Sequence, residues 1–269
     1  MSKTLAQIPN LDGMVKPGEL IEVRPSTDLS LHARRLFNVL IENAWPEITE
    51  DKSHRVEMHK LRGRHKGEQW VADSLRQLMT TIVEVPTKIE GHAGAYETTL
   101  LVETIRTLDE NNDKAVVIFT FSKGMREIIS KSNYWGRIKG YVCFSFSSKY
   151  AISLYEALCL RGNLRVNEQR FSVEDFRGLL GVPEGKLKGF PQLKQSALDP
   201  AVLEVNALSD FTVEISPIRE GGRIRGKLIG FLMRWEKKPR EEWLEVLDEL
   251  GRHKAGRKAR ITGRVEKVA

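Results

Sequence analysis

One stretch decides the fold of this chain: Lys188 to Asp210, KGFPQLKQSALDPAVLEVNALSD. Its apolar residues recur at steps of three or four, which places them on one face of a helix and predicts that this face is core. These residues are Phe190, Leu193, Ala197, Ala201, Val205 and Leu208. The front of the stretch is basic and rich in amides, whereas its back is apolar and acidic. The sequence therefore predicts an amphipathic helix whose two halves have different surroundings.

Pro200 allows two interpretations of this helix. Proline has no backbone N–H, and its ring clashes with the carbonyl four residues earlier. Pro200 therefore either kinks a continuous helix at the Ser196 carbonyl or begins a new helix with Asp199 as its N-cap. Both interpretations leave the front half free to dock on a partner.

The front half is suited to DNA. Lys and Gln side chains at the first turns of a helix can address base edges or phosphates in the major groove, and helix N-termini attract phosphate. We predict DNA contacts from Gln192, Lys194 and Gln195, with Glu204 facing away from the duplex. The alternative is an ordinary amphipathic surface helix.

The flanking segments complete a domain. SKYAISLYEALCLRG, from Ser148, has the broad apolar face of a buried helix. Ser172 is predicted to be an N-cap with Asp175 as its capping-box acid, and Gly181 suits a left-handed helix end. FTVEIS and GKLIGFLMRW alternate around the turn PIREGG, which predicts a β-hairpin. Three helices followed by a hairpin make a winged helix.

The tip of this hairpin is basic. A wing of this kind lies along the DNA backbone, where guanidinium and ammonium groups contact phosphate. We predict such contacts from Arg219, Arg223, Arg225 and Lys227.

The same order of elements is predicted upstream. Helical patterns begin at Leu29, near His54 to Leu61 and from Glu68 to Met79. TIVEVPTKIE, YETTLLVETIRTL and KAVVIFTFS then indicate strands separated by GHAGA and DENND. The predicted class is α+β, with an irregular arm (1–28), a first winged helix (29–146), a second winged helix (147–238), and an extra helix with a basic tail (239–269).

The charge of the chain points to a polyanionic partner. Its formal net charge is +7, and basic residues gather between Arg252 and Lys267 and between Lys60 and Lys66. We predict phosphate contacts from Lys60, Arg62, Arg64 and Lys66 in the first domain. Either basic run is also compatible with a solvated loop or tail, and the C-terminal one lacks the apolar periodicity needed to fold alone.

The quoted segments resemble the C-terminal part of the winged-helix initiators of theta-replicating plasmids, which bind repeated origin sequences called iterons. The resemblance rests on a YAISLYE helix, a helix ending in LLGVPE, and FPQLK leading through LDPA to an asparagine and a strand. It covers roughly residues 28 to 235 and is most specific over the second domain.

The resemblance implies that the second winged helix makes the sequence-specific contacts through its third helix and wing. This points to Lys188 in addition to the helix and wing residues predicted above. It also implies that the first domain mediates dimerisation and that dimers repress the initiator's own promoter. Monomers would open the origin and recruit host replication initiator and helicase proteins. The alternative is a dimeric winged-helix transcriptional regulator with no role in replication.

Enzyme motifs are missing from the sequence. GVPEGK is one residue short of a phosphate loop, and the histidines of HRVEMH are five apart instead of the four of a zinc-protease helix. No His-x-His triplet or nucleophile motif occurs, so we expect no catalytic residue, metal or cofactor. The chain has no apolar run of about eighteen residues and no signal-like start, so we expect a cytoplasmic bacterial protein without membrane contact.

Overall fold

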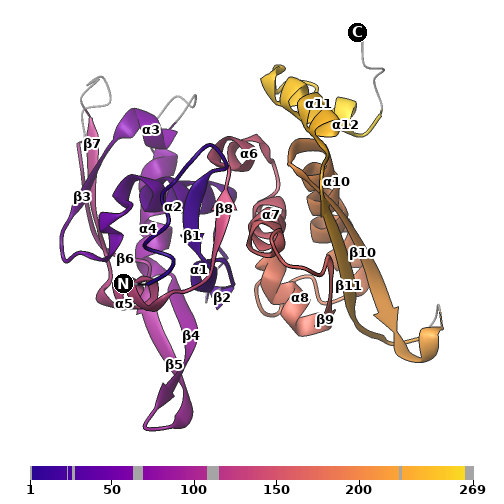
Figure 1. The fold of residues 1–269 in the computed structure, drawn as a ribbon, viewed down its shortest axis with the longest axis horizontal. Helices are drawn as coiled ribbons and strands as arrows, with labels where there is room; N and C mark the ends of the chain where they lie inside the picture. The colour runs from indigo at the N-terminus through magenta and orange to yellow at the C-terminus, as the bar shows by residue number, and fades with distance from the viewer. Residues whose placement is uncertain are drawn as a thin grey trace. The chain divides into compact units, whose positions relative to one another are not determined.

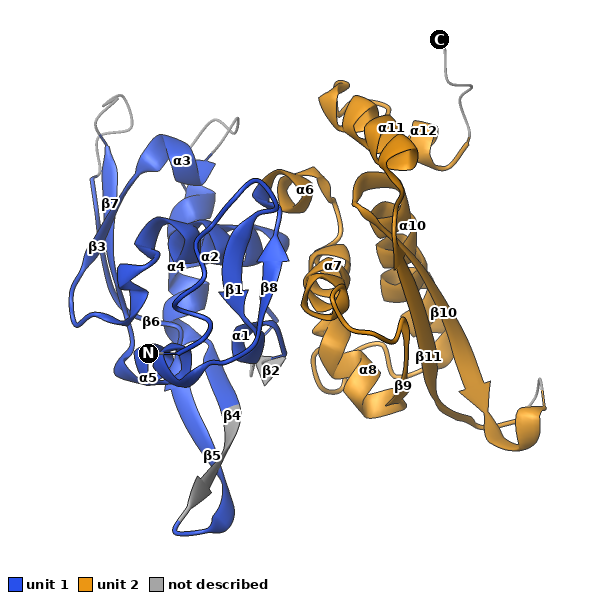
Figure 2. Cartoon of the chain, in the orientation of Figure 1, with its two compact units in different colours: residues 1–140 blue, residues 141–269 orange. Residues whose placement is uncertain are grey.

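The structure is a computed structural model that describes residues 2–22, 24–25, 28–62, 69–107, 115–223 and 226–263. The chain divides into two compact units, Met1–Gly140 and Tyr141–Ala269, which Figure 2 shows in different colours. Each unit consists of helices and small antiparallel sheets (Figure 1), so the predicted α+β class is confirmed.

The second unit has the topology of a winged helix. Its sheet has the strand order β10-β11-β9, so the first strand pairs with the third. A hairpin of two long strands forms the wing (Figure 1). The elements are α7 (Lys149–Arg161), β9 (Glu168–Ser172), α8 (Val173–Leu180), α9 (Phe190–Leu193), the π-helical turn η2 (Lys194–Leu198), α10 (Asp199–Leu208), β10 (Phe211–Arg219), the 3-10 turn η3 (Glu220–Gly222) and β11 (Leu228–Lys237).

The first unit repeats this topology. Its sheet β3-β7-β6 has the same connectivity as β9-β11-β10, with the first strand against the third. The elements are α2 (Leu31–Ala44), η1 (Glu47–Thr49), β3 (His54–Glu57), α3 (Met58–Arg62), α4 (Gln69–Thr80), β6 (Leu101–Arg106) and β7 (Val116–Phe121). A further sheet, β2 (Arg24–Pro25), β4 (Ile82–Ile89) and β5 (His92–Thr99), is inserted after α4. The predicted tandem winged helices are confirmed.

Two local predictions in the first unit were wrong. Residues 54–57 were expected in a helix but form strand β3, because they pair with β7 more than fifty residues later. The sequence predicts one strand over YETTLLVETIRTL, yet this stretch breaks at Leu100 into β5 and β6, which belong to different sheets. The turn before β5 is tight, with positive φ at Glu90 and Gly91, so most of GHAGA lies within the strand.

The N-terminal arm is not irregular, which corrects the prediction for residues 1–28. Strand β1 (Met14–Pro17) pairs with β8 (Trp135–Ile138), and the short helix α1 (Gly18–Glu22) follows it. Met14 and Val15 are buried. Local periodicity could not reveal this strand, because its partner lies more than one hundred residues downstream. Helix α5 (Lys123–Lys131) precedes β8, and α6 (Gly140–Ser145) follows it.

Aromatic side chains fill the core of the second unit. Tyr155 of α7 lies edge-on to Phe146 and Phe211, and Phe176 of α8 lies 4.5 Å from Phe231 of β11 between ring centroids. Burial raises the pKa of Tyr155 well above its usual range, and its hydroxyl donates to Asp210. These contacts attach α7 to the edge strand β10 and α8 to the central strand β11.

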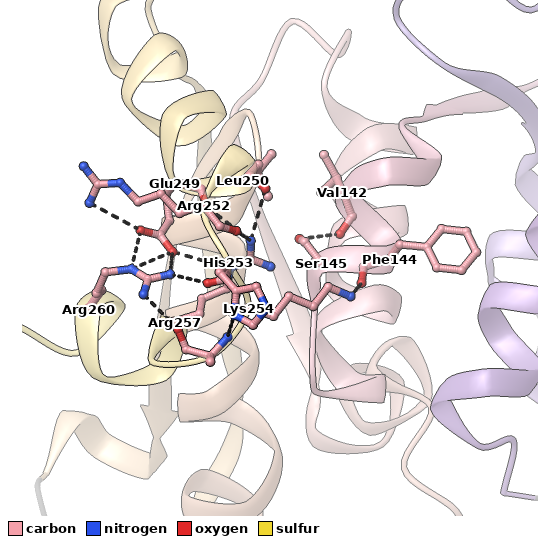
Figure 3. Close-up of polar contacts among 11 residues, drawn as sticks. Val142, Phe144, Ser145, Glu249, Leu250, Arg252, His253, Lys254, Arg257 and Arg260 are labelled. Atoms are coloured by element: carbon pink, nitrogen blue, oxygen red, sulfur yellow. Dashed lines mark hydrogen bonds and ion pairs between the residues drawn. The ribbon is translucent and has the colours of Figure 1, made fainter. Parts of the chain in front are cut away.

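Two helices follow the wing. The extra helix predicted within residues 239–269 is present as α11 (Arg240–Gly251), and α12 (Arg257–Ile261) folds back onto it. Arg260 donates to the Glu249 carboxylate at 2.8 and 2.9 Å, and Arg257 donates to the carbonyls of Glu249 and Leu250 (Figure 3). The bond with Arg260 lowers the pKa of Glu249. Ion pairs therefore fold the first part of the basic tail, which sequence periodicity did not predict.

Within the described ranges, no helix combines the length and the apolar character needed to cross a bilayer.

Candidate nucleic-acid interface

The residues from Phe190 to Leu208 form one helical segment, here named the recognition segment. Its predicted core face is confirmed, because Leu193, Ala197, Ala201, Val205 and Leu208 are all buried. Phe190 is half-buried. The side chains predicted to meet DNA are exposed, both on the segment and just before it: Lys188, Gln192, Lys194 and Gln195. The front of the segment therefore presents amides and ammonium groups to solvent.

The structure decides how Pro200 is accommodated. Leu193, Lys194, Leu198 and Asp199 all have right-handed helical backbone angles, so the segment is continuous and Asp199 is not an N-cap. The Asp199 N–H donates to the Lys194 carbonyl, five residues earlier, in a π-turn. Pro200 has no N–H to donate to the carbonyl of residue 196, and its ring clashes with that carbonyl in a regular helix. The wider π-turn lets the helix continue past the proline.

The π-turn also creates an ion pair on the exposed surface. Lys194 Nζ lies 2.6 and 2.8 Å from the two carboxylate oxygens of Asp199. Both side chains remain about half exposed, at 52% and 53%. Lys194 is thus accessible, but its charge is already engaged within the protein.

The loop before the recognition segment is held by Arg177 of α8. Its guanidinium donates to the Leu187 carbonyl at 2.7 Å and also to the Lys186 carbonyl. Leu187 has a φ of +47°, a conformation that costs energy for a branched side chain. Arg177 therefore fixes the direction in which the chain enters the recognition segment.

Helix α8 begins and ends as predicted. The Ser172 hydroxyl accepts from the Asp175 N–H and donates to the Asp175 carboxylate. Gly181 has a φ of +66°, and Val182 N–H donates to the Arg177 carbonyl, which is the Schellman pattern. The short helix before the recognition segment is therefore specified by local sequence.

The wing is joined to the recognition segment through Arg219. Its guanidinium lies over the Phe190 ring, 5.3 Å from the centroid, and donates to the Gly226 carbonyl at 2.8 Å. Phe190 in turn lies 6.0 Å from Phe231 of β11. Arg219 is only partly exposed, so it links the wing to the helix in addition to any role toward phosphate.

Two other predicted wing residues are exposed and one cannot be placed. Arg223 and Lys227 lie exposed at the end of the hairpin. Arg225 lies outside the described residues.

The back of the recognition segment is anchored to the sheet and to α7. Asn206 pairs with the backbone of Val213, donating to its carbonyl at 3.0 Å and accepting from its N–H at 2.7 Å. Lys238 donates to the carbonyls of Asn206 and Ser209, and burial lowers its pKa. Glu204 is buried and accepts from Ser147 and Ser148. This carboxylate is structural, and it faces the interior.

The predicted contacts of the first unit are only partly visible. Lys60 is exposed, with Nζ 3.3 Å from Glu57, and Arg62 is half-buried at the end of α3. Arg64 and Lys66 lie outside the described residues. Within the described residues of the first unit, Lys60 and Arg62 therefore remain as candidates for phosphate contact.

Sequence reasoning missed two residues of the interface, Asp199 and Arg177. Asp199 stands five positions after Lys194, a spacing that does not bring side chains together in a regular α-helix. Arg177 acts on backbone carbonyls, which carry no signal in the side-chain pattern. Only the position of Pro200 hinted that the helix was irregular there.

Comparisons with known proteins agree with this architecture. A family model described as "Initiator Replication protein, WH1" matches residues 13–159, which is more than half of the chain. A second, described as "Initiator Rep protein, WH2", matches residues 172–229. A search of curated proteins finds no match.

Among solved structures, the chain is similar to the crystal structure of the MSBI1.176 WH1 domain, a replication protein isolated from a multiple sclerosis patient. The match has 17% identity and a TM-score of 0.29, and it covers 38% of this chain and 82% of that one. Similarity at this level adds nothing to the fold assignment.

The WH1 match covers the first unit from residue 13 and extends into α7, and the WH2 match lies within the second unit, so each match falls on a winged helix that the structure shows. Such domains indicate initiation of plasmid replication with DNA binding. The chain therefore belongs to the initiator replication protein family, with a WH1 and a WH2 domain.

Proposed function

We propose that this protein initiates plasmid replication by binding direct-repeat iterons at the origin as a monomer, in the cytoplasm of its bacterial host. The observation that carries the proposal is the exposed, amide- and lysine-bearing front of the recognition segment, braced against a basic wing by Arg219 and Phe190. The helix reads base edges in the major groove while Arg223 and Lys227 contact the backbone. The protein acts by binding and recruitment, without catalysis.

The basic surface of the first unit completes the proposal. Lys60 and Arg62 contact phosphate, together with Arg64 and Lys66. If the two units together make six to ten phosphate contacts, affinity falls by about three to five decades between 50 and 200 mM salt. A slope near zero in a plot of log affinity against log salt concentration would exclude phosphate contacts from both units.

Self-association and host partners form the second part of the proposal and rest on the family resemblance. Dimers formed through the first domain repress the protein's own gene, whereas monomers recruit the host replication initiator and helicase. The competing function is a dimeric winged-helix regulator without a role in replication.

Footprinting on the DNA that flanks the protein's own gene tests the proposal. We expect evenly spaced protections over direct repeats, occupied by one protein each. A dimeric regulator instead protects an inverted repeat, because a two-fold dimer requires symmetric half-sites. Protection of inverted repeats alone would replace the initiator with the regulator.

A further inference from the structure

Asp199 occupies an unexpected position for a helix that meets DNA. Its carboxylate lies on the exposed surface of the recognition segment, among Gln195, Ser196 and Lys194. DNA carries a high density of negative charge, so an unneutralised carboxylate here opposes binding to any duplex. The carboxylate is paired with Lys194, which is among the side chains predicted to contact DNA.

The pairing of these two residues follows from Pro200. In a regular α-helix, residues five apart point in directions about 140° from each other. The π-turn spans five residues with one hydrogen bond, from Asp199 N–H to the Lys194 carbonyl, and so brings both side chains to one side. The contacts of 2.6 and 2.8 Å use both carboxylate oxygens.

We propose that Asp199 is a specificity determinant, whose carboxylate holds the Lys194 ammonium and so weakens binding to DNA that lacks the cognate sequence. A phosphate must displace Asp199 before it can use Lys194, and on random DNA nothing compensates for that exchange. On the cognate repeat, base-edge contacts from the same segment form without breaking the Lys194–Asp199 pair, so the cost of the exchange applies to random DNA alone. This inference rests on the proposed use of the recognition segment in DNA binding.

The first experiment measures the affinity of the full chain for a random-sequence duplex across a salt titration. Asp199→Asn frees Lys194, so we expect two- to fivefold tighter binding, the range of an exposed ion pair. The log-log salt slope becomes steeper by about 0.9, the value for one more phosphate contact. Asp199→Ala should act in the same direction, and it also removes the side-chain oxygen that Asn can still offer to Lys194.

Glu184→Gln is the matched control. Glu184 is exposed in the loop before the recognition segment, so its substitution removes one negative charge from the same neighbourhood without freeing Lys194. We expect a smaller gain in affinity and an unchanged slope. Equal effects of Glu184→Gln and Asp199→Asn would overturn the proposal, because net charge would then explain both.

The second experiment repeats Asp199→Asn in a Lys194→Ala background. If Asp199 acts by holding Lys194, the steeper slope disappears in this background and the gain in affinity shrinks. If both persist, the carboxylate acts through space on the DNA and the proposal fails. Thermal unfolding of each variant checks that the recognition segment is intact.

The inference and the proposed function fail in different ways. Unchanged random-duplex affinity and slope in a folded Asp199→Asn protein would overturn the inference, whatever the wild type does at its origin. Absence of a wild-type footprint on direct repeats would overturn the proposed function and leave the random-duplex result in place. If both stand, Asp199→Asn should also lower the ratio of cognate to random-duplex affinity.

Discussion

The two winged helices share a topology but differ on the surface of the third helix. In the first unit, Asp73 of α4 accepts from both Gln69 and Arg76, so the exposed polar groups of that helix satisfy one another. In the second unit, the amides of Gln192 and Gln195 are exposed, and no hydrogen bond joins either to another side chain in the described part of the chain. Polar side chains that already hydrogen-bond to one another are less available to bind base edges.

The two units also differ in what surrounds the shared sheet. The first carries the inserted hairpin β4–β5 after its third helix, whereas the second carries α11 and α12 after its wing. Both sheets keep the same pairing of first strand against third. The winged-helix sheet is therefore common to both units, and we expect the difference in DNA recognition to lie in side chains on one helix and one hairpin.

The largest expected effect comes from removing a buried aromatic side chain beneath the recognition segment. Phe231→Ala should cost about 3–5 kcal/mol of unfolding free energy and abolish the footprint, because Phe231 packs on Phe176 and supports Phe190. Phe119→Ala is the matched change on the central strand of the first unit. It should be similarly destabilising, but where the second unit stays folded the same repeats should still be protected, at a higher protein concentration because the phosphate contacts of the first unit are weakened. Urea unfolding and footprinting measure both; equal loss of the footprint would contradict the contrast.

The next largest effect concerns base recognition. Gln195→Ala should cost about 1–3 kcal/mol of binding free energy on the cognate repeat and much less on random DNA if, as we propose, the amide reads a base edge. Gln69→Ala on α4 should change neither affinity, since Gln69 bonds to Asp73. Titration of both duplexes by fluorescence anisotropy tests this. Equal losses on the two duplexes would move base recognition away from the recognition segment.

A smaller effect separates the wing from the helix. Arg223→Ala should weaken binding to cognate and random DNA by the same factor and reduce the salt slope by about 0.9, because one phosphate contact is lost. Arg76→Ala removes a cation from the first unit that is already paired with Asp73 at 2.7 Å, and its slope should stay that of the wild type. A sequence-dependent loss for Arg223→Ala would show that the wing reads bases.

The smallest effect is a pH dependence in the first unit. Burial lowers the pKa of His54, which lies against Phe119 and Phe121, below the usual value of about 6.5. The unfolded chain then takes up the proton first, so stability present above pH 6.5 is lost as pH falls toward the folded pKa. His54→Gln should reduce the change in unfolding free energy between pH 7.5 and pH 5. Carboxylate titration affects both proteins equally, so it cancels in the difference between the wild type and the variant. Parallel curves of unfolding free energy against pH would exclude His54 as the source of the pH dependence.

The sequence predicted best where a signal was local. Ser172, Asp175 and Gly181 marked the limits of α8, and the spacing of Leu193, Ala197 and Ala201 marked the buried face of the recognition segment. The sequence did not predict strand β3 of the first unit or its counterpart β9 of the second unit. Each is four or five residues long and sits at the edge of its sheet, where composition carries little information and pairing with a distant strand decides the structure.

The sequence by itself determined the tandem winged-helix order and the cationic, amide-rich front of the recognition segment, because periodicity, caps and charge act over a few residues. Tertiary structure alone decided that the N-terminal residues join a sheet, that Arg219 bridges the wing to Phe190, and that Arg177 braces the entry to the segment. It also placed Asp199 against Lys194, since a proline that a regular helix cannot accept was absorbed by one π-turn. Those contacts join residues by backbone geometry and distant packing, which no local pattern records.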